Sequence, residues 1–200
     1  PRTGGCLDES PVLKDFDSTD FLTSITLLTS YSDHKSGSGK SVSCKRKDVL
    51  DLKLHDYQKY SDSISEGLIR AARFLTREKV FDSRDLPYKT QLIPLSVICA
   101  VLGDRFESDP IHRKLARWYW SGVFGELYGG ANETRYALDV PDVLDWIAGG
   151  NEPRTVSAAS FSPTRLVTLQ SRLSAAYKGL MAKLMQTGSN DFISGEPIEV

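Results

Sequence analysis

Three basic residues near the C-terminus have a spacing that suits contact with phosphate groups. Arg165, Arg172 and Lys183 fall within about 20° of one another when a helix turns about 100° per residue. The predicted helix that contains them has no acidic residue between Thr164 and Gln186. A row of cations binds nucleic-acid phosphates, and that binding weakens as salt rises. The row is therefore a candidate nucleic-acid site, and a solubilising flank of a core helix is the alternative.

A second candidate set lies in the most aromatic segment, residues 111–128. Arg113, Arg117 and Trp120 stand at positions i, i+4 and i+7, so a helix brings two guanidinium groups and an indole to one face. Such a face can contact nucleobases and phosphates. The three consecutive aromatic residues 118–120 cover about 200° of a helix, so at least one must be buried. Packing in the core is the main expectation for these aromatic side chains.

Patterns for catalysis and for metal binding are weak. The segment 37–41, Gly-Ser-Gly-Lys-Ser, resembles a phosphate-binding loop, but His34 occupies the position of its first glycine and a helical pattern precedes it. The three histidines have no His or Cys partner at ligand spacing. Cys99 lies in an apolar segment, where a thiol packs as a small hydrophobic group. We predict no catalytic and no metal-binding residue, and an enzyme whose site assembles only in space remains an alternative.

The hydrophobic periodicity is helical, and no segment shows the alternation of a half-buried strand. The sequence predicts an all-α fold, an irregular bundle of about six or seven helices. Asp17 is expected to cap a helix that fades near Tyr31, and a long amphipathic helix is expected to run from Tyr57 to Leu75. The remaining helices are expected from Leu92, over 111–128, from an Asp139 cap to Gly149, and from a Ser162 cap to Gly188.

The expected domain organisation is one helical domain between two non-helical ends. Residues 1–15 are expected to form an extended arm, and residues 16–190 the helical domain with a Ser/Gly-rich flexible loop at 32–41. Residues 191–200 are expected to be a linker. The chain begins at Pro1 and ends in a polar stretch, so both ends are interpreted as cuts in a longer protein.

The composition excludes several classes of protein. The chain has 200 residues, 40% of them hydrophobic, with 25 Lys and Arg against 26 Asp and Glu. These values are not those of a disordered tail or a coiled-coil rod. The longest nearly unbroken apolar run, Leu92–Leu102, is too short to cross a bilayer, so no membrane contact is expected. Three cysteines favour a reducing cytoplasm. A formal net charge of −1 argues against strong autonomous binding to DNA.

Two longer segments carry a resemblance to a known family. Residues 86–95, LPYKTQLIPL, followed by residues 117–130, RWYWSGVFGELYGG, are similar to segments of the GmrSD-type restriction endonucleases. Residues 16–22 and 42–50 also resemble segments of that family, so the similarity spans most of residues 16 to 198. The order and spacing of these segments make the resemblance more specific than any one of them.

The resemblance implies a role in phage defence. Such proteins are modification-dependent DNA nucleases with an N-terminal ParB-like, nucleotide-binding module, which carries a DGQQR-type motif, and a C-terminal HNH nuclease. Neither motif is in this chain, so no catalytic residue of the family can be transferred to a position here. The resemblance therefore implies that this chain is the central helical region, which couples the two modules. Nucleotide and divalent metal are expected only in those modules, and DNA and a second copy are the expected partners. The alternative is a protein-interaction or dimerisation scaffold without nucleic-acid contact.

Overall fold

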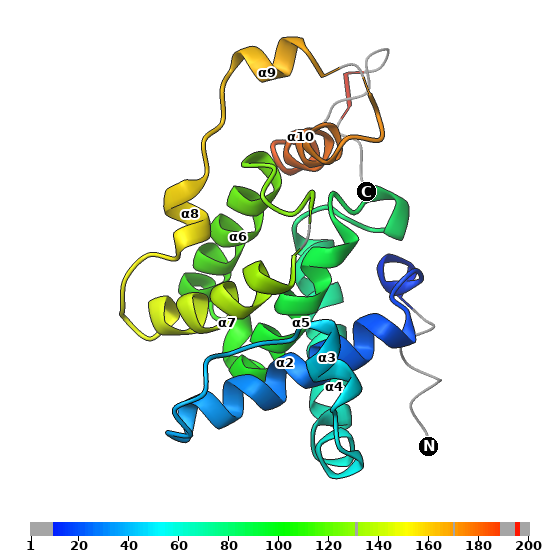
Figure 1. The fold of residues 1–200 in the computed structure, drawn as a ribbon. Helices are drawn as coiled ribbons and strands as arrows, with labels where there is room; N and C mark the ends of the chain where they lie inside the picture. The colour runs from blue at the N-terminus through cyan, green and yellow to red at the C-terminus, as the bar shows by residue number, and fades with distance from the viewer. Residues whose placement is uncertain (1–9, 131, 170, 189–194, 197–200) are drawn as a thin grey trace.

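The computed structural model describes residues 10–130, 132–169, 171–188 and 195–196, and every regular element among them is helical. This confirms the predicted all-α, irregular bundle (Figure 1). The α-helices are α2 (Ser18–Lys35), α3 (Arg46–Leu50), α4 (Leu54–Arg77), α5 (Leu92–Leu102), α6 (Asp109–Phe124), α7 (Glu133–Ile147), α8 (Arg154–Ala158), α9 (Thr164–Val167) and α10 (Ala175–Gln186). Short 3-10 turns are η1 (Pro11–Leu13), η2 (Ser83–Asp85), η3 (Lys89–Gln91) and η4 (Gly103–Glu107).

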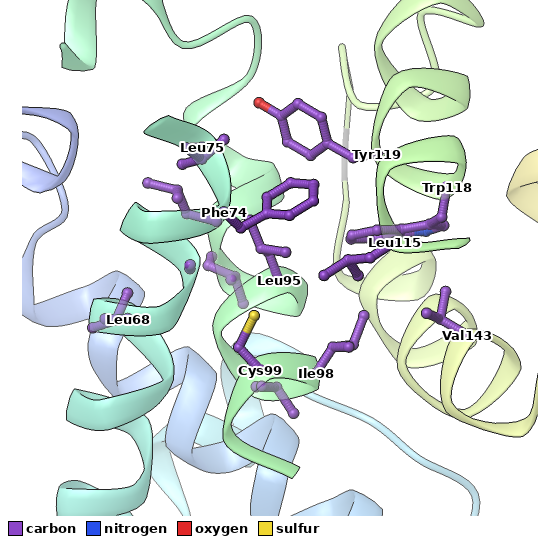
Figure 2. Packing of buried hydrophobic residues seen from close by; sticks show 14 of the residues in the cluster. Leu68, Phe74, Leu75, Leu95, Ile98, Cys99, Leu115, Trp118, Tyr119 and Val143 are labelled. Carbon is purple, nitrogen blue, oxygen red and sulfur yellow. The ribbon is translucent and has the colours of Figure 1, made fainter. Parts of the chain in front are cut away.

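Helix α5 lies at the centre of the bundle. Its residues 92–99 are all buried, as expected for a helix that is apolar nearly all round. Pro94 lies in its first turn, where the missing N–H costs little. Helices α2, α4 and α7 pack against it. Figure 2 shows Leu95, Ile98 and Cys99 of α5 between the side chains of α4 and those of α6.

The crossing of α4 over α5 depends on one glycine. A Cβ atom at Gly67 would collide with the carbonyl oxygen of Ser96 and lie 2.9 Å from the Cβ of Ala100. The two backbones are therefore closer than any side chain at this position allows. The remaining contacts of α4 come from its buried stripe, which includes Ile64, Leu68 and Leu75, as the predicted amphipathic pattern requires.

Helix α2 begins where the sequence predicts and ends later. Asp17 accepts hydrogen bonds from the N–H groups of Thr19 and Asp20, at 2.8 and 3.0 Å, and Asp20 accepts one in return from the N–H of Asp17. The helix continues to Lys35, so the expected loop at 32–41 is wrong for its first four residues. Gly37, with φ +84°, supplies the left-handed residue that ends the helix.

The prediction of a short helix that begins at Asp139 is wrong. Helix α7 begins at Glu133, and Asp139 lies buried in its middle. The carboxylate accepts hydrogen bonds from the hydroxyls of Tyr128 and Thr155. It therefore makes tertiary contacts and does not cap the start of a helix. Pro141 is accommodated inside the same helix.

The prediction of one continuous helix from Ser162 to Gly188 is also wrong. The chain forms the single turn α9, leaves the helical conformation, and re-enters it at α10. Ser174 explains the restart, because its hydroxyl donates to the carbonyl of Ser171 and accepts from the N–H of Tyr177. Serine side chains that bond the local backbone in this way compete with helix continuation and favour a cap.

The remaining boundaries differ in detail. Helix α6 ends at Phe124 and not at residue 128, because Glu126 adopts the left-handed conformation at φ +53°. The expected extended arm 1–15 is wrong at η1, where Val12 and Leu13 are buried in the core. Residues 1–9 lie outside the described residues, as does the expected linker 191–200 apart from residues 195 and 196.

Replacing Gly67 with Ala should destabilise the fold by about 1–3 kcal/mol, because the added methyl group must push α4 away from α5. Urea unfolding followed by tryptophan fluorescence measures the change. Gly130→Ala is the matched control, since nothing lies within 4 Å of a Cβ at that position. Equal stability of the two variants would contradict the close crossing.

Candidate interaction surface around the C-terminal helix

Helix α10 attaches to the bundle through small residues. Ala176, Gly179 and Ala182 form its buried inner face, and this face packs on α6. A Cβ atom at Gly179 would lie 2.9 Å from Val123 and 3.2 Å from the Phe124 ring. The inner face is thus as close to α6 as the helix backbone allows, but it buries little side-chain surface.

A buried carboxylate holds the C-terminal end of α10. Glu78, at the end of α4, accepts hydrogen bonds from His112 Nε2 at 2.8 Å and from Trp120 Nε1 at 2.5 Å, both on α6. From α10, Lys183 Nζ and Gln186 Nε2 donate to its Oε2 atom at 3.2 and 2.9 Å. The Lys183 ammonium also lies 4.4 Å from the centre of the Trp120 ring. We call this set the Glu78 junction.

The environment of the junction favours the ionised form of Glu78. Burial raises the pKa of Glu78, but the hydrogen bond from Trp120 and the positive charge of Lys183 outweigh it, so the pKa lies below its ordinary value. Burial lowers the pKa of Lys183, and the charge of Glu78 offsets part of that change. The junction is a partly buried ion pair whose carboxylate is satisfied by neighbouring donors.

The outer face of α10 is apolar and uncovered by the described residues. Tyr177, Met181 and Leu184 form a stripe on this side, and Leu173 continues it before the helix begins. Leu173, Met181 and Leu184 are 84%, 42% and 49% exposed. Soluble proteins expose single apolar side chains freely, and a contiguous row of them is a candidate interaction surface.

Four cations border a shallow groove along this stripe. The groove has a volume of about 160 Å³ and is lined by Lys79, Arg84, Arg172 and Lys178, with Asp85 as the acidic residue of the lining. Arg84 pairs with Asp82 at 2.9 Å, and Lys178 donates to the carbonyl of Leu86. Arg172 is exposed and makes no ion pair with any described residue. We refer to the stripe and these four cations together as the α10 surface.

The predicted row of Arg165, Arg172 and Lys183 is not brought together. The interruption between α9 and α10 removes the common helical register on which the row was based. Arg165 pairs with Glu126 at 2.7 Å, and Lys183 is committed to the Glu78 junction. Only Arg172 of the three contributes to the α10 surface, and its contact with DNA remains a prediction.

The second predicted set is brought together only in part. Arg117 and Trp120 line one shallow pocket together with Lys183, and Arg113 does not line it. Arg113 and Arg117 are exposed on α6, whereas Trp120 is buried beneath Lys183. Arg117 pairs with Glu152 at 2.6 Å. Arg113 makes no ion pair within the described part of the chain. The aromatic segment packs in the core, as expected, and all of residues 118–120 are buried.

Sequence reasoning missed Glu78 and two cations of the groove, Lys79 directly after Glu78 and Arg84 in η2. One signal for Glu78 was available. An acidic residue at the C-terminal end of a helix is unfavourable for the helix dipole, so its presence at the end of α4 indicates a partner from elsewhere in the fold. The identity of those partners, on α6 and α10, depends on tertiary structure alone.

A groove of about 640 Å³ lies between α2, α3 and α7, and Cys44 and Tyr136 line it. Burial raises the pKa of Cys44 to about 12 and raises that of Tyr136 as well, which keeps both groups protonated and unreactive at neutral pH. Among the described residues, no group of three acidic, His or Cys side chains is placed to hold a metal ion.

Comparisons with known proteins give one weak relative. The chain is 30% identical over 90 residues to the uncharacterized protein MJ0686 of Methanocaldococcus jannaschii. The aligned part is 42% of this chain, and it spans only 16% of the relative. No family model matches the chain, and no solved structure matches it. Among the described helices, none has the length and apolar character that crossing a membrane requires.

Replacing Glu78 with Gln should lower the stability by about 2–3 kcal/mol at neutral pH, because it removes the charge that the buried donors surround. The pKa of Glu78 is lower in the folded chain than its ordinary value of 4.5. Its stabilisation is therefore complete above pH 4.5 and is lost as the pH falls through the folded pKa. Urea unfolding should show a difference between wild type and variant that shrinks as the pH falls below 4.5.

The control for this experiment is Glu126→Gln, which removes the exposed carboxylate that pairs with Arg165. An exposed ion pair contributes little, so this change should stay within about 0.5 kcal/mol at every pH. A Glu78 variant whose destabilisation is the same at neutral and acid pH would show that the charge of this residue does not hold α10.

Proposed function

We propose that this chain is the non-catalytic helical middle region of a phage-defence, modification-dependent DNA restriction protein. In this role it couples an N-terminal nucleotide-binding module to a C-terminal HNH nuclease. The nucleotide and the divalent metal belong to those modules, and the protein acts in the cytoplasm. The resemblance of residues 86–95 and 117–130 to GmrSD-type proteins supports the proposal.

The contact between these two segments adds support. The side chain of Gln91 donates a hydrogen bond to the carbonyl oxygen of Tyr119 at 3.0 Å, and both residues are buried. A Cβ atom at Gly122 would lie 2.7 Å from Gln91 Nε2, so the second segment has a glycine where the first approaches it. The two segments that carry the resemblance thus pack against each other in this fold.

The observation that carries the coupling role is the arrangement of α10. This helix is fixed to the bundle by its inner face and by the Glu78 junction, while its apolar outer face is uncovered by the described residues. A helix that is held in a defined orientation and presents apolar side chains outwards is suited to contact a second module. A second copy of the chain is a further partner that such a face accommodates.

Contact with DNA is the finer part of the proposal. Of the five predicted cations, Arg113 and Arg172 are exposed and free of ion pairs with described residues, so they are the two that can contact phosphates without first breaking a salt bridge. The scaffold without nucleic-acid contact remains the second candidate function. The ion pairs of Arg117, Arg165 and Lys183 favour it.

Fluorescence anisotropy of labelled duplexes tests the DNA contact, with plain, hydroxymethylated and glucosylated cytosine, each at three salt concentrations. The expected result is micromolar binding that weakens with salt. Replacing Arg113 and Arg172 with Ala together should reduce the affinity about tenfold. The slope of log affinity against log salt should fall by the amount expected for the loss of about two phosphate contacts.

The matched control replaces Arg117 and Arg165 with Ala, because their guanidinium groups are already committed to Glu152 and Glu126. This variant should bind within about threefold of wild type. Absence of binding at low salt would contradict the DNA contact and leave the scaffold as the better account.

A further inference from the structure

We infer that the α10 surface is a docking site for an acidic amphipathic helix of a protein partner. This inference rests on the proposed coupling function and deepens it, because it names the chemistry of the partner. It is carried by the combination, on one face, of exposed aliphatic side chains and cations that surround them.

The apolar part of the surface has the geometry of a helix-binding stripe. Tyr177, Met181 and Leu184 follow one another at spacings of four and three residues, so they lie along one line parallel to the α10 axis. Leu173 precedes the helix and lines the same groove as Tyr177 and Met181. A partner helix with apolar residues at positions i, i+4 and i+7 can pack along such a line. Methionine adapts its shape to the packed side chain, which suits a surface that binds a partner.

The charge of the surface selects an acidic partner. Lys79 lies on one side of the groove and Arg172 and Lys178 lie on the α10 side, with Asp85 as the acidic residue of the lining. Arg84 lines the groove as well, but its charge is paired with Asp82 at 2.9 Å. Residues 175–186, which form α10, contain no acidic residue. Glu or Asp side chains that flank the apolar stripe of a partner helix would meet these cations, which favours correct orientation and rapid association.

Two other occupants match the surface less well. A nucleic-acid backbone satisfies the cations but leaves the exposed Leu173, Met181 and Leu184 without an apolar partner. A second copy of the chain, paired about a twofold axis, places the cations of one α10 surface against the same cations of the other. Like charges in that position oppose association.

The probe for this inference is a labelled synthetic helix of about 20 residues, with Leu at i, i+4 and i+7 and Glu at the flanking positions. A basic peptide with Lys in place of each Glu is its counterpart. Fluorescence anisotropy with the intact chain should give micromolar binding of the acidic peptide and at least tenfold weaker binding of the basic one.

Variants of the chain locate the binding. Arg172→Glu should weaken binding of the acidic peptide about fivefold, and it breaks no ion pair with a described residue. Met181→Asp should weaken this binding about tenfold, because it places a charge in the apolar stripe. Arg113→Glu is the matched control, because Arg113 is also an exposed, unpaired cation but does not line the groove, and it should change the affinity less than twofold. Circular dichroism confirms that each variant is folded.

A charge exchange provides the sharpest test. The double variant Arg172→Glu with Lys178→Glu should prefer the basic peptide, and a structural defect would not produce that reversal. Failure of the acidic peptide to bind, or equal binding by Met181→Asp, would overturn the inference. If duplex DNA binds and loses affinity in Arg172→Glu while the peptide does not bind, the α10 surface is a nucleic-acid site. In that case the inference fails and the proposed DNA contact stands.

Discussion

The need to enclose α5 determines the arrangement of the other helices. This helix is apolar on nearly every side, and a helix without a polar face is stable only when neighbours cover it completely. Each fully buried Leu, Ile or Val contributes about 1.5–3 kcal/mol relative to its exposed state. Helices α2, α4 and α7 therefore pack directly on α5, and the glycine at position 67 permits the close approach of α4. The buried face of α6 completes the same core (Figure 2).

Helix α10 lies outside this enclosure, and its position has a different physical basis. Its inner face of Ala and Gly buries too little apolar surface to define an orientation alone. The Glu78 carboxylate supplies the missing specificity, because a buried charge must keep its donors and two of them come from α10. Lys183 and Gln186 reach the same oxygen only when α10 has one rotation and one register. The direction in which Met181 and Leu184 point is thus set from the opposite side of the helix.

The sequence alone predicts the helices that packing defines and fails where local and tertiary demands compete. Helix α4 follows from its stripe and α5 from its unbroken apolar run. The start of α7 does not, because Asp139 has the sequence signature of a cap while its carboxylate is used by Tyr128 and Thr155. The break before α10 depends on Ser174, whose hydroxyl forms local backbone bonds in place of a continued helix. Neither outcome is encoded in periodicity.

The candidate sites show the same limit more clearly, because a cation in a sequence carries no information about its counterion. Arg165 and Lys183 find Glu126 and Glu78, which lie 39 and 105 residues away. A chain with 25 basic and 26 acidic residues neutralises many of its cations in this way, so a helical row of basic residues overstates the charge available to a ligand. The informative positions are the cations left without a counterion beside apolar side chains left without a neighbour. Among the described residues the two features coincide at Arg172 and Leu173, and again at Arg46 and Leu50, and such positions suit a ligand that offers carboxylates or phosphates together with an apolar face.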